Sequence, residues 1–223
     1  RFKARWLRGW PEALLRLHGN WLEAAGRLPV PANLGTPGAR NSRRVSNAGP
    51  AIYEVTHTPS LPAAGQAAVV SARVHDFNAV QSLALNYRID PGAAYTSVPM
   101  NDGGAGGDAI AGDGVFSATI PGQSAGVAAF YLEGKDAANA INRFPQLLFP
   151  TAPLTRCFPV DSPACECVVR WGERSMPGSF GAYHVWLTSA NTARWRDRRP
   201  VLDNTPNDAT FVYNNYRVIY NVR

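Results

Sequence analysis

The sequence predicts a mainly β protein, in which an antiparallel β-sandwich of the immunoglobulin or fibronectin type III kind is flanked by two incomplete parts. The first observation is a series of short strand-forming stretches, separated by turn signals, across residues 51–149. The second is strict alternation of apolar and polar residues, as at Val70, Ala72 and Val74. The third is composition: the 223 residues are 45% hydrophobic and 17% charged, which is typical of a globular chain with a core and not of a disordered one.

The residues ahead of the sandwich predict a truncated module and a linker. Residues 1–28 read as two strands around the turn Gly9-Trp10-Pro11. Two strands cannot close a core, so we expect them to be the last strands of a module whose other strands lie upstream. Residues 29–50 are rich in proline and glycine and lack apolar periodicity, which predicts a stiffened linker. The chain opens on Arg1 without an initiator methionine, so we expect a piece of a longer protein, without its signal peptide.

Residues 51–149 predict the complete sandwich. Alternation is clearest where Leu83 and Leu85 are interleaved with Ser82 and Asn86. No Cys…Cys pair of the antibody type lies in this range, so the likeness to immunoglobulin domains is architectural. The expected strands are 51–57, 66–76, 80–90, 94–100, 114–120, 126–136 and 139–149.

Two further segments follow the sandwich. Residues 150–182 hold all three cysteines with several Pro and Gly, and we expect an irregular connector. Residues 183–223 predict a strand, a short helix capped by Thr188 or Ser189, and a hairpin turning at Asn214-Asn215 as a two-residue loop. A lone hairpin is marginal in water, so we expect 183–223 to be the truncated start of another domain.

The acidic, glycine-rich loop 101–114 is the candidate metal site. Asp102, Asp108 and Asp113 could supply charged oxygens to calcium, while glycines let backbone carbonyls turn inward. Their spacing does not match the EF-hand pattern. The alternative is a long hairpin loop in which Asp and Gly serve turn conformations. A phosphate-binding loop is disfavoured because no Lys follows the glycines.

The cysteines Cys157, Cys165 and Cys167 leave two interpretations open. A disulfide between Cys157 and one of the other two fits an extracellular protein and leaves one thiol over. A zinc site needs four ligands, and these three would require the distant His184 as the fourth. We expect the disulfide.

Several function classes are excluded or disfavoured. No hydrolase, zincin, Walker or dinucleotide-binding signature occurs, so no catalytic or cofactor-binding residue is assigned to this segment. The net charge of +6 comes from the two ends, because residues 45–142 alone carry −5. The basic run 194–199 has no nucleic-acid-binding module around it, so we expect no nucleic-acid partner. No apolar run approaches the roughly 20 residues that span a bilayer.

Aromatic residues in the first segment carry a separate hypothesis. Trp6, Trp10 and Trp21 could stack on sugar rings, or they could pack into a core or a domain junction. Either role buries large aromatic surface, so the sequence leaves both open.

Three stretches together resemble proteins of the spore-coat-protein-H-like (CotH) kinase family. Residues 1–25 are similar to the last strands of a jelly-roll carbohydrate-binding-type module, and residues 102–122 resemble the Ig-like modules that precede the kinase domain in large bacterial surface proteins. The third stretch resembles the start of the kinase domain itself: it comprises His184-Val185-Trp186-Leu187-Thr188 and the run 202–222, Leu-Asp-Asn-Thr-Pro-Asn-Asp-Ala-Thr-Phe-Val-Tyr-Asn-Asn-Tyr-Arg-Val-Ile-Tyr-Asn-Val.

The resemblance implies a non-catalytic scaffold segment of a secreted or surface multidomain bacterial protein, linking an upstream module to a downstream atypical protein-kinase-like domain. The ATP, magnesium and catalytic groups of such a kinase would lie beyond Arg223, and so would contact with a protein substrate; none of those groups is carried over onto this chain. The alternative function is a glycan- or surface-binding β-sandwich module without linked kinase activity. Both imply an extracellular or cell-surface location.

Overall fold

The computed structural model describes residues 46–145, 165–174, 178, 181–196 and 208–222. The chain divides into two compact units, residues 1–46 and 47–223, and the fold described here belongs to the second. The strands expected in 1–28, the tryptophans there, nearly all of the expected linker 29–50, and Cys157 lie outside the described residues.

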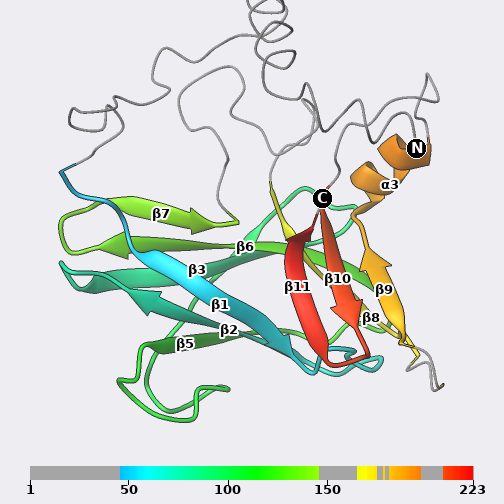
Figure 1. Ribbon diagram of the computed structural model, residues 1–223, viewed down its shortest axis with the longest axis horizontal. Helices are drawn as coiled ribbons and strands as arrows, with labels where there is room; N and C mark the ends of the chain where they lie inside the picture. The colour runs from blue at the N-terminus through cyan, green and yellow to red at the C-terminus, as the bar shows by residue number, and fades with distance from the viewer. Residues whose placement is uncertain (1–45, 146–164, 175–177, 179–180, 197–207, 223) are drawn as a thin grey trace, which may run out of the picture. The chain divides into compact units, whose positions relative to one another are not determined.

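Two antiparallel sheets form the sandwich (Figure 1). The first has the order β1-β2-β5, and the second has the order β4-β3-β6-β7, with β8 also paired to β6. The prediction of a mainly β, antiparallel sandwich is therefore confirmed. The strand bounds are β1 Ala51–Thr58, β2 Ala68–His75, β3 Val80–Ile89, β4 Thr96–Pro99, β5 Val115–Ile120, β6 Gly126–Asp136, β7 Ile141–Phe144 and β8 Cys167–Trp171.

The core lies between the two sheets and follows the alternation of the strands. On β2, every second residue is buried, from Ala68 through Val74. These side chains meet Leu83, Leu85 and Phe130 of the second sheet in one apolar cluster. A side chain on a strand points to one face only, so the pattern that predicts these strands also fixes which residues form the core.

The alternation of β3 breaks at its C-terminal end. Leu83 and Leu85 are buried as expected, but Ile89 is 39% exposed, whereas Arg88 is only 8% exposed. A charged residue is almost never this buried without an ion-pair partner. Something must therefore cover and neutralise Arg88 on the outer side of this sheet.

Strand β8 lies where an irregular connector was expected. Cys167, Val168, Val169 and Trp171 are buried, and β8 pairs with β6 from Phe130↔Cys167 to Gly126↔Trp171. The partner β7 pairs only with residues 132–135 of β6, so the other half of the same β6 edge is open to β8. Part of the expected connector thus completes the sandwich sheet.

A third sheet and a helix follow. The sheet has the order β11-β10-β9, with β9 at Tyr183–Trp186, β10 at Ala209–Tyr213 and β11 at Arg217–Val222 (Figure 1). Helix α3 spans Ser189–Arg196. Asn214 and Asn215 both have positive φ, as the predicted hairpin turn requires. The pairing Tyr213↔Arg217 leaves three residues between the strands, one more than predicted.

The third sheet packs against the sandwich rather than standing apart from it. Trp186 and Val212 join Val127 and Val168 of the sandwich in a second apolar cluster. Tyr220 of β11 belongs to the main core and meets Phe130 edge to face. Within the described ranges, no helix has the length and apolar character needed to cross a membrane.

Candidate functional site

The structure brings together the three carboxylates of the acidic loop. One ligand-capable oxygen from each of Asp102, Asp108 and Asp113 lies within 4.8 Å of the others. Asp102 accepts backbone N–H bonds from Gly112 and Gly114, at 2.7 and 2.9 Å, and another from Asp113. A carboxylate that accepts several amides organises a turn and still has lone pairs left.

The loop is also held against the sandwich. A Cβ at Gly107 would lie 2.2 Å from Cγ1 of Val69 on β2, and Gly107 has φ of 109°. Only glycine tolerates both the contact and the conformation. Asp108, 6% exposed, accepts N–H bonds from Gly104 and Ile110, so its carboxylate closes the loop from inside. This arrangement shows the turn-building role directly.

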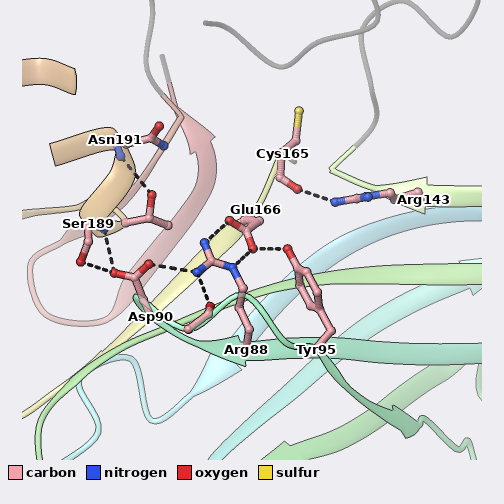
Figure 2. Close-up of polar contacts among 10 residues, drawn as sticks. Arg88, Asp90, Tyr95, Arg143, Cys165, Glu166, Ser189 and Asn191 are labelled. Carbon is pink, nitrogen blue, oxygen red and sulfur yellow. Dashed lines mark hydrogen bonds and ion pairs between the residues drawn. The ribbon is translucent and has the colours of Figure 1, made fainter. Parts of the chain in front are cut away.

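The two described cysteines, Cys165 and Cys167, differ in oxidation state. Cys165 is disulfide-bonded, and Cys167 is a buried free thiol. Burial raises the pKa of Cys167 well above its ordinary value, which keeps the thiol protonated and unreactive. Arg143 of β7 donates a 2.8 Å hydrogen bond to the backbone carbonyl of Cys165, which fixes the chain just ahead of β8 (Figure 2).

A network of ion pairs and hydrogen bonds surrounds Arg88. Its guanidinium donates two hydrogen bonds to Glu166, at 2.6 and 2.7 Å, in a fork that matches both carboxylate oxygens. It also donates to Asp90 at 3.1 Å and to the carbonyl of Gly92. The hydroxyl of Tyr95 donates to the same Glu166 (Figure 2). Glu166 is therefore the group that buries Arg88 and neutralises it.

The same network reaches the helix. Asp90 accepts hydrogen bonds from the backbone N–H and hydroxyl of Ser189, the first residue of α3. Thr188 caps the helix by accepting the N–H of Asn191 at 3.3 Å, which confirms one of the two predicted caps. The carboxylate at the positive end of the helix is also electrostatically favourable.

Burial and hydrogen bonding in this network shift the pKa values of Arg88 and Tyr95. Hydrogen bonding to Glu166 raises the pKa of Arg88 above its already high value. Burial, followed by the hydrogen bond to Glu166, raises the pKa of Tyr95 to about 12. Neither group titrates near neutral pH, so the arrangement is a fixed structural pair and is not poised for proton transfer.

A second set of contacts joins the other side of the sandwich to the third sheet. His57 of β1 is 2% exposed, and its Nε2 lies 3.2 Å from the carbonyl of Ser60. A carbonyl only accepts, so Nε2 carries the proton and Nδ1 accepts the hydroxyl of Tyr220 from β11. Ser60 donates to the carbonyl of Asn215 in the hairpin turn. Burial lowers the pKa of His57 to about 4.

We call these two sets together the junction. Its ionic end comprises Arg88, Asp90, Tyr95, Glu166 and Ser189, and its neutral end comprises His57, Ser60, Asn215 and Tyr220. Sequence reasoning missed both ends. The one available signal was Arg88 itself, which stands at a polar position of an alternating strand and therefore resembled an ordinary exposed side chain.

The zinc alternative included Cys157, which lies outside the described residues, and the described residues do not bring His184 together with Cys165 and Cys167 as a metal-ligand group. His184 faces Asn215 at 2.9 Å and Glu173 at 3.7 Å, and only the three loop aspartates group as a metal-ligand cluster there. Comparison of the chain with protein-family models and with curated proteins finds no match.

Proposed function

We propose that the chain is a non-catalytic scaffold segment of a secreted or surface multidomain CotH-like protein. In this role the sandwich fixes the orientation of the sheet β9–β11, and through it the start of a downstream kinase-like domain. The observation that carries the proposal is the junction: His57 of the first sheet contacts Tyr220 of β11, and Asp90, next to β3 of the second sheet, accepts hydrogen bonds from Ser189 of helix α3.

The junction suits a rigid connection. Within the sandwich, Arg88 pairs with Glu166 and holds Asp90, the residue that contacts helix α3. The side chains of Arg88 and Glu166 are 9% and 6% exposed, so water screens their attraction weakly. Breaking one partner of a buried pair leaves an uncompensated charge. Connections between domains that rest on small polar contacts are expected to move; here the apolar cluster of Trp186, Val212, Val127 and Val168 adds a packed interface.

The kinase connection rests on the resemblance of residues 183–223 alone. We expect the parent reading frame to continue past Arg223 into a domain that holds ATP and magnesium. A stop codon directly after Arg223 would contradict this. The chain itself, incubated with magnesium ATP and a protein acceptor, is expected to transfer no phosphate.

Spin-label distances test the scaffold. Cysteines placed at Phe77, which is 99% exposed in the β2–β3 turn, and at Val185, which is 60% exposed on β9, would carry the labels. We expect one narrow distance distribution in the doubly labelled chain without further substitution, and a broad one when Arg88→Ala is added. Arg73→Ala is the matched control, because Arg73 pairs with the exposed Glu54 within the sandwich. A broad distribution in the labelled chain without further substitution would refute the scaffold function.

For the acidic loop we propose calcium as the ligand that offsets repulsion among its three carboxylates. We expect a higher melting temperature in calcium than in excess chelator, since a ligand that binds only the native state stabilises it. Asp108→Asn, which keeps an acceptor oxygen but removes charge, should abolish the difference. An unchanged melting temperature would leave turn formation as the whole role of these residues.

A further inference from the structure

The outer face of the third sheet is unlike the outer faces of the sandwich. On β2, the residues between the core positions include Ser71 and Arg73, and these are polar. On the third sheet, the inward positions include Trp186 and Val212, so alternation places their neighbours outward. Those outward residues include Arg217 and five aromatic or aliphatic residues, Tyr183, Val185, Phe211, Tyr213 and Ile219. Contiguous apolar surface of this kind marks binding sites.

Aromatic rings gather at one end of this face, beside the hairpin turn. Tyr183 lies with its ring centroid 5.9 Å from Phe211, in a stacked arrangement, and 5.4 Å from Tyr213. Tyr216 extends the group, 6.4 Å from Tyr213. Tyr183 is 64% exposed and Tyr216 is 70% exposed, so both rings present surface to solvent. We call Tyr183, Phe211, Tyr213 and Tyr216 the aromatic platform.

The platform combines apolar rings with unused polar groups. Within the described part of the chain, the hydroxyls of Tyr183, Tyr213 and Tyr216 make no hydrogen bond. Sugars present the same combination, with apolar C–H faces that stack on aromatic rings and hydroxyls around the rim. Tyrosine suits such ligands because one end is apolar and the other hydrogen-bonds.

An exposed cation lies on the same face as the platform. Arg217 is exposed and stands directly opposite Tyr213 in the strand pairing. The acids of the same part of the chain are occupied: Glu166 is paired with Arg88, Glu173 is paired with Arg170, and Asp208 is 3% exposed. An anionic ligand therefore fits this face better than a neutral one.

We propose that the aromatic platform binds an anionic polysaccharide of the uronic-acid type. Its sugar rings stack on Tyr183 and Tyr216, and a carboxylate pairs with the fork of Arg217. This binding site goes beyond the scaffold function and does not depend on it. It is also separate from the three N-terminal tryptophans, for which the sequence suggests sugar contact.

Affinity electrophoresis in gels that contain polygalacturonate, with dextran as the neutral comparison, tests the proposal on the full chain. We expect retardation by polygalacturonate only. Tyr183→Ala and Tyr216→Ala should each weaken binding about tenfold, the scale of one lost aromatic contact. Arg217→Ala should weaken it and reduce its dependence on salt. These side chains are exposed, and circular dichroism would verify that the variants stay folded.

Two controls separate a specific site from general attraction of a basic protein. Arg196→Ala removes the same charge from helix α3, away from the platform, and should leave retardation unchanged. If it weakens binding as much as Arg217→Ala does, or if polygalacturonate retards no variant differently, the proposal is overturned. Absence of retardation overturns it as well.

A second outcome would reassign the face. Val185→Thr and Ile219→Thr reduce apolar surface at the two positions paired with Phe211, while all four platform rings are kept. If these changes abolish self-association in sedimentation velocity while no polysaccharide binds, the face is a contact between copies of the chain, and the glycan proposal fails. Spin-label distances measured in labelled chain diluted with unlabelled chain report only the distance within one copy, so the scaffold and the glycan site can fail separately.

Discussion

The acidic loop and the junction both concentrate charged or polar side chains. In the loop the bonding partners are close in sequence, whereas in the junction they are far apart in sequence. In the loop, three like charges lie within 4.8 Å and are met by backbone amides from residues 104–115. At the ionic end of the junction, opposite charges come from Arg88 and Glu166, which are 78 residues apart. The loop shapes one turn, whereas the junction holds separate segments in a single arrangement.

The difference lies in what each region stabilises. Amide-to-carboxylate bonds in an exposed loop exchange with water at modest net cost, so losing one is tolerated. A buried ion pair has no such substitute, because removal of one partner leaves the other desolvated and uncompensated. Damage to the junction should therefore affect the whole unit, and damage to the loop should stay local.

The largest effect is expected for Arg88→Ala. Glu166 would remain 6% exposed without its cation, and the free energy of unfolding should fall by about 3–5 kcal/mol. Urea denaturation followed by circular dichroism measures this. Arg88→Lys keeps the charge but loses the fork and should recover only part of the loss. Wild-type stability in Arg88→Ala would contradict the central role of the pair.

Acidification should weaken the neutral end of the junction. His57 has a pKa of about 4 in the folded chain and 6.5 in the unfolded chain. Between these two pH values the unfolded chain binds a proton at His57 and the folded chain does not. Stability from this group is complete above pH 6.5 and falls as the pH drops toward 4, by about 3 kcal/mol. Denaturation at stepped pH would show this slope.

Substitution of the two histidines separates His57 from other titrating groups. His57→Gln should flatten the slope between pH 6.5 and 4, whereas His75→Gln, on the exposed end of β2, should preserve it. An unchanged slope in His57→Gln would mean that acid sensitivity arises elsewhere.

A smaller effect is expected for Asp102→Ala in the loop. Three N–H groups lose their acceptor. Because water can hydrogen-bond to these groups in its place, the free energy of unfolding should fall by only about 1–2 kcal/mol. Asp102→Asn keeps an acceptor and should cost less. The spin-label distance should stay narrow in both variants; if it broadens, the loop is not independent of the junction.

The smallest effect is expected for Arg73→Ala. Arg73 pairs with Glu54 at 3.0 Å, in the same chemistry as Arg88 with Glu166, but on the exposed face of the first sheet. Solvent screens such pairs, so the melting temperature should not change measurably. A clear loss there would mean that burial is not what distinguishes the junction.

The sequence predicted the features that depend on near neighbours. Alternation along β2 identified its core residues, Asn214 and Asn215 gave the positive-φ turn, and the aspartates and glycines of 101–114 indicated one compact loop. Each of these rests on interactions within about a dozen residues, where local propensity and pattern are informative.

The rest depends on pairings that no local pattern encodes. Strand β8 is five residues long and nearly all buried, so it lacks alternation and was taken for part of a connector. Arg88 resembled a surface residue because its partner, Glu166, lies in the segment that was taken for a connector. The hairpin β10–β11 was predicted as a hairpin, but its packing against His57 and Phe130 was not. Tertiary contact decides such cases.

Strand β6 has one further consequence. It pairs with β3 along one edge, while β7 and β8 share its other edge end to end. The covalent connection between those two strands is therefore not what aligns them; β6 is. A chain cut between residues 145 and 165 should reassemble from its two fragments, with the C-terminal fragment supplying β8 and Glu166 to a sandwich that has a vacant half-edge.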